Sequence, residues 1–374
     1  MFSASDHAHM ARALRLAERG LATTQPNPRV GCAIAHGDEV VGEGWHQRAG
    51  GAHAEVFALR AAGQRARGAT AYVTLEPCGL HGRTPPCADA LIEAGVARVV
   101  IASEDAFQRH GGGVDRLRAA GIAVEAGLMR DAARELNRGF FSRIERRRPW
   151  LRVKLAMSLD GRTALASGES KWITGEAARA DVQRWRARSS AILTGSGTVL
   201  RDDPRLTVRT SGHHPHPGPP LEGEGVAVLR VLLDTRLDTP VGAHLLDGSA
   251  PTLVVHGPNG CARDERYARV ERVAVEIRDG RLDLGAVLAM LAARGVNELQ
   301  VEAGPTLCGA LFAEGLVDEL LLYVAPVLLG DSAKPLLSLP PLDAMAERAQ
   351  LRVVDRRQVG EDMRLLLRPV RPSQ

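Results

Sequence analysis

Apolar residues recur along the first part of the chain with two alternating periods, one typical of helices and one typical of strands. Residues 6–19 carry Met10, Ala13, Leu14 and Ala17 on one helical face, and Gly20 follows as a stop signal. Further helices are predicted at 53–62, 88–94 and 114–120, and strands at 30–35, 40–44, 69–75, 98–102 and 122–125. This alternation predicts an α/β sandwich with its strands in the middle.

A second alternation of the same kind starts at Trp150. Strands are predicted at 151–156, 191–194, 231–233, 252–255, 299–302 and 319–324, and helices at 176–187, 284–293 and 307–314. The stretch 143–149 is charged and ends in Pro149, which favours a junction there. A chain of 374 residues also exceeds the size of most single cores. We therefore expect two domains, residues 1–148 and 149–374.

Composition narrows the class of protein. A hydrophobic fraction of 45% and a charged fraction of 25% are ordinary for a globular chain, and a net charge of +4 indicates no nucleic-acid partner. Five cysteines, an odd number in a long chain, argue against a disulfide framework, and a reducing cytoplasm is the expected location. No leader or membrane-spanning run is visible. The His- and Pro-rich stretch 211–220 is expected to be a surface insertion.

One His and two Cys have the spacing of a catalytic zinc site. His53-Ala54-Glu55 begins a predicted helix, and Cys78 and Cys87 each follow a proline further along the chain. Three nitrogen and sulfur ligands suit tetrahedral zinc and leave its fourth position for water, whose pKa zinc lowers towards about 7. Glu55 is placed to move a proton from that water to a leaving amine. This is the signature described for zinc deaminases, here with eight residues between the cysteines.

Three other interpretations of these residues stay open at this point. The cysteines could be buried core residues, or His81 could complete a closed structural zinc site with four ligands. A deaminase of nucleic acids is a third possibility, but aromatic residues are rare and no concentrated basic stripe accompanies them. A metal-activated hydrolytic deaminase of an amino-substituted ring explains the pattern best.

The second half lacks the G-x-G-x-x-G pattern of a Rossmann dinucleotide site. Two glycine-rich turns after predicted strands could still cradle phosphates. One is Gly304-Pro305-Thr306, where Pro305 suits the first position of a helix, and the other is Gly195-Ser196-Gly197-Thr198. A glycine after a strand is usually only a turn, but the presence of two such turns favours a dinucleotide-binding site.

Longer motifs identify a resemblance that covers nearly the whole chain. They are Asn27-Pro28-Arg29-Val30-Gly31-Cys32, Gly44-Trp45-His46, His53-Ala54-Glu55, Thr74-Leu75-Glu76-Pro77-Cys78, Gly82-Arg83-Thr84-Pro85-Pro86-Cys87, Lys154-Leu155-Ala156-Met157-Ser158-Leu159-Asp160-Gly161-Arg162, Asp202-Asp203-Pro204-Arg205-Leu206-Thr207-Val208-Arg209 and Val301-Glu302-Ala303-Gly304-Pro305-Thr306-Leu307. Together they resemble the bifunctional riboflavin-biosynthesis deaminase/reductase family.

The resemblance implies a cytidine-deaminase-like α/β/α sandwich in the first half and a dihydrofolate-reductase-like α/β domain in the second. It implies zinc-dependent deamination of a diamino-hydroxy-(phosphoribosylamino)pyrimidine, followed by NADPH-dependent reduction of the ribosyl to a ribityl chain. The zinc ligands carry over to His53, Cys78 and Cys87 and the proton shuttle to Glu55. Asn27, His46 and Arg83 are then expected to hold the pyrimidine and its phosphate.

For the second half the resemblance implies two sets of contacts. The NADPH contacts are Ala156, Trp172, Thr198, Thr235, Gly304, Pro305, Thr306, Leu307 and Gly309. The contacts to the phosphoribosyl substrate are Lys154, Asp160, Ser170, Arg186, Asp202, Leu206, Arg209 and Glu302. The expected partners are this small molecule and other copies of the chain, with no nucleic acid and no membrane.

Two loops depart from the family pattern. Gly79-Leu80 follows the first zinc cysteine where the family usually has Ser-His, and Asp105-Ala106-Phe107-Gln108 replaces Asp-Pro-Asn-Pro in a slightly shorter loop. Both loops are expected to border the deaminase substrate. The alternative hypothesis is therefore a monofunctional reductase whose deaminase half is weakened or shifted to another substrate.

Overall fold

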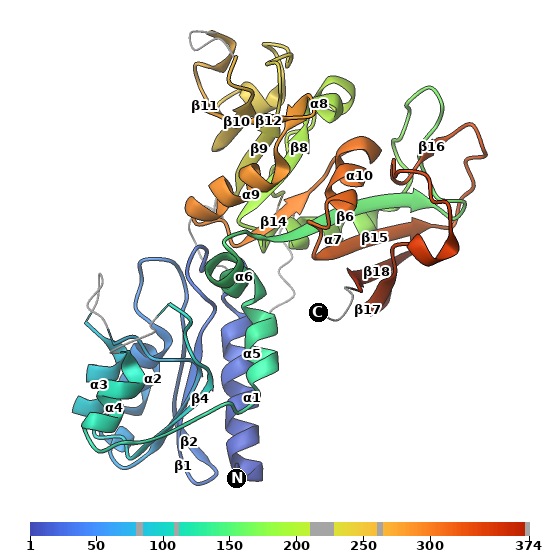
Figure 1. The fold of residues 1–374 in the computed structure, drawn as a ribbon. Coiled ribbons are helices and arrows are strands. Elements are labelled where there is room, and N and C mark those ends of the chain that lie inside the picture. The colour runs from blue at the N-terminus through green and yellow to red at the C-terminus, as the bar shows by residue number, and fades with distance from the viewer. Residues whose placement is uncertain (80–84, 108–111, 210–227, 260–264, 371–374) are drawn as a thin grey trace. The chain divides into compact units, whose positions relative to one another are not determined.

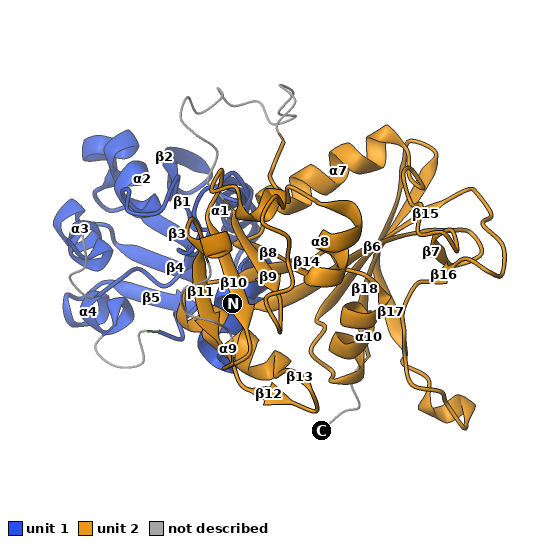
Figure 2. Ribbon diagram, turned by 90° about the horizontal axis from the view of Figure 1, so that it is seen from above, with its two compact units in different colours: residues 1–147 blue, residues 148–374 orange. Residues whose placement is uncertain are grey.

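The computed structural model describes residues 1–79, 85–107, 112–209, 228–259 and 265–370. Its chain forms two compact units, residues 1–147 and 148–374 (Figure 2). Leu80, His81, Arg83 and Gln108 lie outside the described residues, as does the His- and Pro-rich stretch at 211–220. Among the described residues, no helix combines the length and apolar character that crossing a bilayer requires.

The first unit is built on a five-stranded sheet in the order β2-β1-β3-β4-β5. Its strands are β1 Gly31–His36, β2 Glu39–Trp45, β3 Thr70–Leu75, β4 Arg98–Ser103 and β5 Ala123–Ala126. β1 pairs antiparallel with β2 and β3, whereas β3, β4 and β5 run parallel. The parallel strands place their carboxyl ends at one edge, where the segments after β3 and β4 begin.

Helices cover both faces of this sheet (Figure 1). They are α1 Ala4–Glu18, α2 Ala54–Ala62, α3 Cys87–Ala94, α4 Gly113–Ala119, α5 Arg130–Leu136 and α6 Arg138–Arg146, with a 3-10 turn at Gly63–Ala66. One hydrophobic core joins the sheet to α2, α3 and α4, and another joins it to α1 and α5. The unit is therefore the expected α/β/α sandwich.

Asp6 ties helix α1 to the sheet. Its carboxylate closes a capping box with Ser3 and accepts hydrogen bonds from the Tyr72 hydroxyl at 2.8 Å and from Arg98 Nη1 at 2.6 Å. The side chain is buried, and the hydrogen bond from Arg98 holds its pKa well below the usual range for aspartate. A group whose pKa is lowered by folding contributes stability above its unfolded pKa of about 3.9, and this stability is lost as the pH falls.

We expect Asp6→Asn to destabilise the first unit by about 2–4 kcal/mol, because it leaves Arg98 without its buried partner. The deficit should shrink as the pH falls below about 4, which chemical denaturation at several pH values would measure. Asp89→Asn removes the exposed ion pair with Arg116 and should cost less than about 1 kcal/mol. Equal costs for the two variants would contradict the assignment.

The second unit is built on a nine-stranded sheet in the order β11-β10-β9-β8-β14-β6-β15-β18-β17. Its strands are β6 Trp150–Ser158, β8 Ala191–Gly195, β9 Leu229–Leu233, β10 Thr252–His256, β11 Glu271–Ala274, β14 Glu298–Val301, β15 Glu319–Ala325, β17 Leu351–Val359 and β18 Asp362–Pro369. The seven strands from β11 to β15 are parallel, and β18 and β17 add an antiparallel hairpin. Ligands bind such sheets at the carboxyl ends of their parallel strands.

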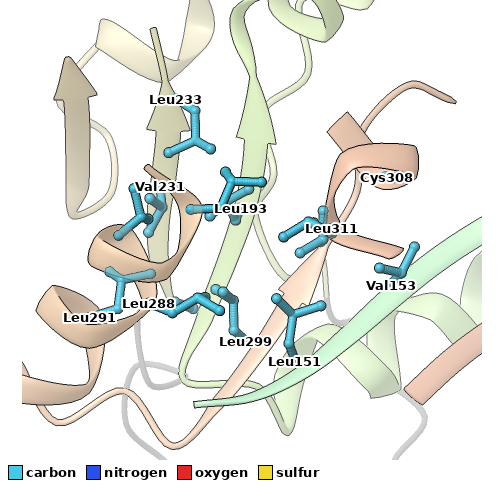
Figure 3. Close-up of a cluster of buried hydrophobic side chains, with 14 of the residues drawn as sticks. Leu151, Val153, Leu193, Val231, Leu233, Leu288, Leu291, Leu299, Cys308 and Leu311 are labelled. Carbon is cyan, nitrogen blue, oxygen red and sulfur yellow. The ribbon is translucent and has the colours of Figure 1, made fainter. Parts of the chain in front are cut away.

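Smaller elements complete this unit. Its helices are α7 Glu176–Ala187, α8 Ser196–Asp202, α9 Leu284–Ala293 and α10 Pro305–Ala313. Two small two-stranded pairs are β7 Arg162–Ala164 with β16 Lys334–Pro335, and β12 Ile277–Arg278 with β13 Arg281–Leu282. Single 3-10 turns lie at His244–Leu246, Glu265–Tyr267 and Met345–Glu347. The main core packs α9 and α10 against the sheet through leucines and valines such as Leu291, Leu311 and Leu299 (Figure 3).

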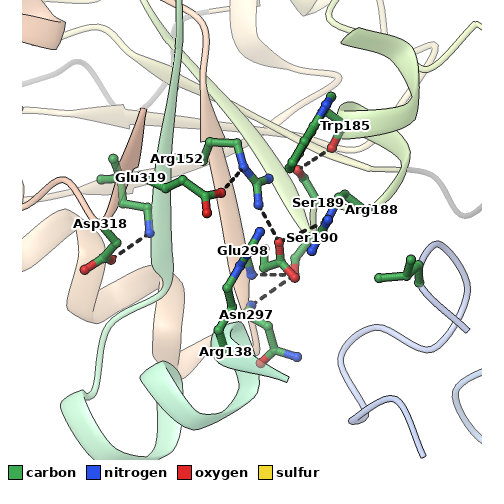
Figure 4. A network of polar contacts seen from close by, with 12 residues as sticks. Arg138, Arg152, Trp185, Arg188, Ser189, Ser190, Asn297, Glu298, Asp318 and Glu319 are labelled. Atoms are coloured by element: carbon green, nitrogen blue, oxygen red, sulfur yellow. Dashed lines mark hydrogen bonds and ion pairs between the residues drawn. The ribbon is translucent and has the colours of Figure 1, made fainter. Parts of the chain in front are cut away.

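A buried ion network crosses three neighbouring strands of the sheet (Figure 4). Arg152 on β6 donates to Glu319 on β15 at 2.7 Å and to Glu298 on β14 at 2.9 Å, and all three side chains are fully buried. The Arg152 guanidinium also lies 4.5 Å from the centre of the Trp185 ring on α7. Removing Arg152 would leave two buried carboxylates without the arginine that they share, which is expected to be strongly destabilising.

The structure differs from the sequence predictions in several regions, and the short elements α5, α8, β7, β11, β12, β13 and β16 are among those that were not predicted. The charged stretch that begins at Arg143 continues helix α6 as far as Arg146, because Phe140 and Phe141 give that helix a buried apolar face. Strands β17 and β18 were not predicted. β17 is an edge strand rich in exposed charged residues, so it lacks a readable alternation.

Candidate functional site

His53, Cys78 and Cys87 come together at the carboxyl edge of the first sheet. His53 caps the start of α2, Cys78 lies just after β3 and Cys87 begins α3. Their ligand atoms all lie within 4.8 Å of one another, with His53 Nδ1 3.2 Å from Cys87 Sγ and 3.5 Å from Cys78 Sγ. Tetrahedral zinc with N and S ligands places those atoms roughly 3.5 Å apart. The donor set and its geometry therefore fit a zinc ion.

The protonation of this cluster also favours a cation. The hydrogen bond between the two thiols lowers the pKa of Cys78 and raises that of Cys87. The hydrogen bond from His53 also stabilises the Cys78 thiolate. A thiolate is the form in which cysteine binds metals, so one ligand is already prepared.

Glu55 is buried beside this cluster, in the first turn of α2, and hydrogen-bonds with the Cys87 thiol. Burial raises the pKa of Glu55 to about 7. A carboxyl group that gains and loses a proton near neutral pH is suited to general acid and base work. Its position on the same helix as His53 keeps it next to the metal site without making it a fourth ligand.

Asn27 and His46 line the approach to the same cluster. Asn27 Nδ2 lies 3.1 Å from His46 Nε2, and His46 Nδ1 lies 3.0 Å from the Ala52 carbonyl oxygen. The carbonyl can only accept, so His46 carries its proton on Nδ1 and accepts from Asn27 at Nε2. Burial lowers the pKa of His46, which keeps the ring neutral. The Asn27 amide oxygen is then oriented to accept a hydrogen bond from an amino group, and the His46 ring meets His53 edge-on at 5.5 Å.

The two loops that depart from the family pattern meet in the structure. Glu76 is buried after β3, and its carboxylate accepts from the backbone N–H groups of Asp105 and Val114, each at 3.2 Å. Gly79 lies against the start of α4, where a Cβ atom would lie 2.5 Å from the carbonyl carbon of Gly112 and 2.7 Å from Gly113 N. Any larger residue would push these two backbones apart. Position 79 therefore has to be glycine for the two backbones to lie this close together.

We expect Gly79→Ser, which restores the residue usual in the family, to impair this chain. The added side chain should cost about 1–3 kcal/mol in stability of the first unit, because the backbone it meets cannot rotate away. The unfolding temperature of the first unit should fall in thermal denaturation, while that of the second unit, which holds neither residue, serves as the internal control. An unchanged unfolding temperature would show that the close approach of Gly79 to Gly112 does not constrain the first unit.

The second unit contains a cavity of about 1290 Å³ at the carboxyl edge of its sheet. This exceeds the usual 300–1,000 Å³ of a ligand pocket and leaves room for a dinucleotide together with a substrate. Of the expected NADPH contacts, those that line it are Ala156, Trp172, Thr198, Thr235, Gly304, Pro305, Thr306 and Leu307. Of the expected substrate contacts, those that line it are Lys154, Ser170, Arg186, Asp202, Leu206, Arg209 and Glu302.

Two expected contacts do not line this cavity. Asp160 is exposed, and its carboxylate accepts the backbone N–H groups of Leu329 at 3.1 Å and Gly330 at 2.8 Å. Gly309 packs against Ser338, whose carbonyl oxygen would lie 2.0 Å from an added Cβ. The structure therefore gives Asp160 the role of tethering a loop and Gly309 that of allowing α10 to pack closely.

Lys154, Arg186 and Glu302 form a charged wall of the cavity. Arg186 donates to Glu302 through Nε at 2.7 Å and Nη2 at 2.8 Å. Burial alone would raise the pKa of Glu302, but the nearby Arg186 and Lys154 lower it to about 2. Burial lowers the pKa of Lys154. The two neighbouring cations therefore keep Glu302 ionised inside the cavity.

Sequence reasoning missed several residues that line this cavity. Arg179 stacks on the exposed ring of Trp172, with its guanidinium carbon 4.6 Å from the ring centre. Arg278 and Arg281 reach the cavity from the β12–β13 hairpin. The only available signal was the Asp279-Gly280 pair between them, a dipeptide typical of a tight hairpin turn.

Two family models match this chain, one in each of the two halves that its motifs distinguish. Residues 3–103 match the cytidine and deoxycytidylate deaminase zinc-binding region. Residues 149–365 match the RibD C-terminal domain. The zinc-binding match includes His53, Cys78 and Cys87, and the second match includes most of the residues that line the cavity.

Comparison with individual proteins gives matches over the full length. The riboflavin biosynthesis protein RibD of Escherichia coli K12 is 49% identical, covering 97% of this chain and 99% of the relative, and that of Haemophilus influenzae is 44% identical over 98% of each. A solved structure of Acinetobacter baumannii RibD superposes with a TM-score of 0.87 at 44% identity, covering 98% of this chain and 99% of that chain. A deaminase/5-amino-6-(5-phosphoribosylamino)uracil reductase from Thermotoga maritima superposes with a TM-score of 0.82 at 30% identity, with the same coverage.

Proposed function

Because this chain belongs to the RibD family of bifunctional riboflavin-biosynthesis enzymes, we propose that residues 1–148 form its zinc-dependent pyrimidine deaminase and residues 149–374 its NADPH-dependent reductase. The protein is both a deaminase and a reductase of riboflavin biosynthesis. The alternative of a monofunctional reductase is not favoured, because the zinc-binding region matches and its His53, Cys78 and Cys87 stand together.

The cluster of His53, Cys78 and Cys87 with Glu55 beside it carries the deaminase proposal. Zinc held by these three residues would activate water for attack on the ring carbon that bears the amino group. Glu55 takes the proton from water and delivers it to the departing ammonia. Asn27 and His46 hold the pyrimidine, and Arg83, from its place in the sequence, is proposed to bind the phosphate. The substrate is the 2,5-diamino-6-(5-phosphoribosylamino)pyrimidin-4-one.

The cavity at the carboxyl edge of the second sheet carries the reductase proposal. NADPH supplies the hydride when bound, and the chain positions it and completes the proton balance. At the N-terminus of α10, which begins at Pro305, the backbone N–H groups of Thr306 and Leu307 would donate to the cofactor's pyrophosphate. Hydride addition at the first ribose carbon opens the sugar ring, and Lys154 donates the proton that the ring oxygen then requires. Ser170, Asp202, Leu206 and Arg209 form the substrate side of the cavity.

Metal analysis tests the deaminase assignment directly. We expect one zinc ion per chain, and removal by a chelator should stop ammonia release without slowing reduction of the already deaminated substrate. Restoring zinc should restore ammonia release. Ammonia release that persists in metal-free protein would contradict the assigned site.

We further propose a cytoplasmic homo-oligomer. Strand β17 is the edge of the nine-stranded sheet, and Val353 and Val354 on it are exposed. Leu328, Leu342 and Met345 in the preceding segments are also exposed apolar residues. An unpaired edge strand with neighbouring apolar side chains is the kind of surface that a second copy of a chain covers.

A further inference from the structure

Two arginines stand directly opposite each other on the short β12–β13 hairpin. Arg278 pairs with Arg281 in the register, and Ile277 pairs with Leu282. The turn between them is Asp279-Gly280, with positive φ angles of 51° and 74°, as in a tight type I′ hairpin. Directly opposed residues point to the same face of a hairpin, and like charges in that position repel. An anion between the two guanidinium groups would relieve this repulsion.

The hairpin is anchored so that this face meets the cavity. Leu282 is buried in the main core of the unit, and both arginines line the cavity. Ile277 packs against Gly257, where its Cδ1 atom would lie 2.7 Å from an added Cβ. Gly257 in turn donates its N–H to the Thr235 carbonyl at 3.0 Å. The hairpin, labelled β12 and β13 in Figure 2, therefore stands at the carboxyl ends of β9 and β10.

The charges of the two arginines are unequally compensated. Arg278 Nη2 lies 3.3 Å from Asp283 Oδ2, but Asp283 also caps helix α9 by accepting from Ala286 N. Among the described residues, Arg281 has no ion pair. The pair therefore carries more positive charge than its neighbours neutralise, in the lining of the cavity.

The order of the strands places this pair at one end of the proposed cofactor. Lys154 and Ala156 lie on β6, the α10 N-terminus follows β14, and Thr235 follows β9. Adjacent strands are about 4.8 Å apart, so β6 and β9 are separated by roughly 14 Å. A cofactor whose nicotinamide is held beside β6 and whose pyrophosphate is held at α10 would have its adenosine ribose near β9, next to the hairpin.

We propose that Arg278 and Arg281 form a clamp for the 2′-phosphate of the cofactor's adenosine ribose and so determine the preference for NADPH over NADH. This inference rests on the proposed cofactor site of the reductase. Guanidinium groups recognise a phosphate dianion through paired hydrogen bonds, and an arginine beside the ribose is the usual means of accepting this phosphate. Asp279, at the tip of the hairpin, also lines the cavity. An acidic residue in such a position binds the free 2′-hydroxyl of NADH, so a role for Asp279 in place of the arginines would give a preference for NADH.

The test compares the two cofactors in the full-length protein supplied with the deaminated substrate. Replacing both arginines with alanine is expected to raise KM for NADPH by about 10- to 100-fold and to change KM for NADH by less than about twofold. The conservative double lysine variant should keep most of the preference. Arg294→Ala removes an arginine that pairs with Glu271 and does not line the cavity, so it should behave as the wild type.

Binding of small probes separates the clamp from the reaction. The wild type should bind 2′,5′-ADP more tightly than 5′-ADP by calorimetry, and the double alanine variant should bind both equally. If the wild type oxidises neither cofactor but still discriminates between the probes, the clamp stands and the proposed reductase activity fails. Equal affinity of the wild type for both probes, or a wild-type preference for NADH, would overturn the clamp.

Discussion

Replacing Glu55 with glutamine is expected to slow ammonia release by about 10²- to 10⁴-fold while zinc stays bound. The side chain keeps its shape, so the buried position beside Cys87 is filled as before. The variant loses only the group that carries a proton between water and the departing amine. Reduction of the already deaminated substrate should proceed at the wild-type rate, because it takes place in the other unit.

A matched control shows whether the loss comes from the site. Glu39→Gln changes an exposed glutamate of the same unit that pairs with Arg65, and we expect it to leave ammonia release unchanged. Zinc content and thermal unfolding are measured on both variants. Ammonia release at the wild-type rate in Glu55→Gln would contradict the proton-transfer role, and loss of zinc from that variant would show that Glu55 acts as a ligand.

The second large effect is expected at Lys154. Its replacement with methionine should lower kcat for NADPH oxidation by about 10²- to 10⁴-fold, with little change in KM for NADPH and none in ammonia release. The methionine fills the same position in β6 but cannot donate a proton. Because burial lowers the pKa of Lys154, the ammonium loses its proton below the usual pKa of about 10.4, so wild-type reduction should fall as the pH rises towards that value.

Replacing Lys154 with arginine shows whether the reaction needs the positive charge of the lysine or the proton that it donates. Lys154→Arg keeps a cation beside Glu302 but releases no proton in the working pH range. We expect this variant to be nearly as slow as Lys154→Met and to lose the alkaline fall in rate. A full rate in Lys154→Arg would show that the positive charge alone is needed, and a full rate in Lys154→Met would remove Lys154 from the mechanism.

The deaminase site was predictable because its signals are local. His53 and Glu55 lie on one helix, and Cys78 and Cys87 follow recognisable turns, so their spacing alone indicated a metal site. The contact of Gly79 with Gly112 could not be predicted, since it joins two backbone segments far apart in the sequence. That contact explains why this chain departs from the family pattern at a position so close to its zinc ligands.

The second unit was less open to prediction for two physical reasons. The resemblance placed Asp160 with the substrate, but its carboxylate is occupied by the backbone of Leu329 and Gly330, which lie about 170 residues further along the chain. The arginines of the β12–β13 hairpin belong to strands of only two residues each, too short for any periodicity to register. The main strands and helices were predicted because most of them are segments rich in leucine and valine that are bounded by turn residues.

The most direct test of the account is a coupled assay on one purified preparation of the full chain. The diaminopyrimidine substrate is supplied with NADPH and zinc, and ammonia release and NADPH oxidation are followed separately. We expect ammonia to appear first and NADPH to be consumed in step with the deaminated intermediate. NADPH oxidation that occurs only when the deaminated intermediate is supplied, with no ammonia released from the diaminopyrimidine, would contradict the claim that this chain carries both activities.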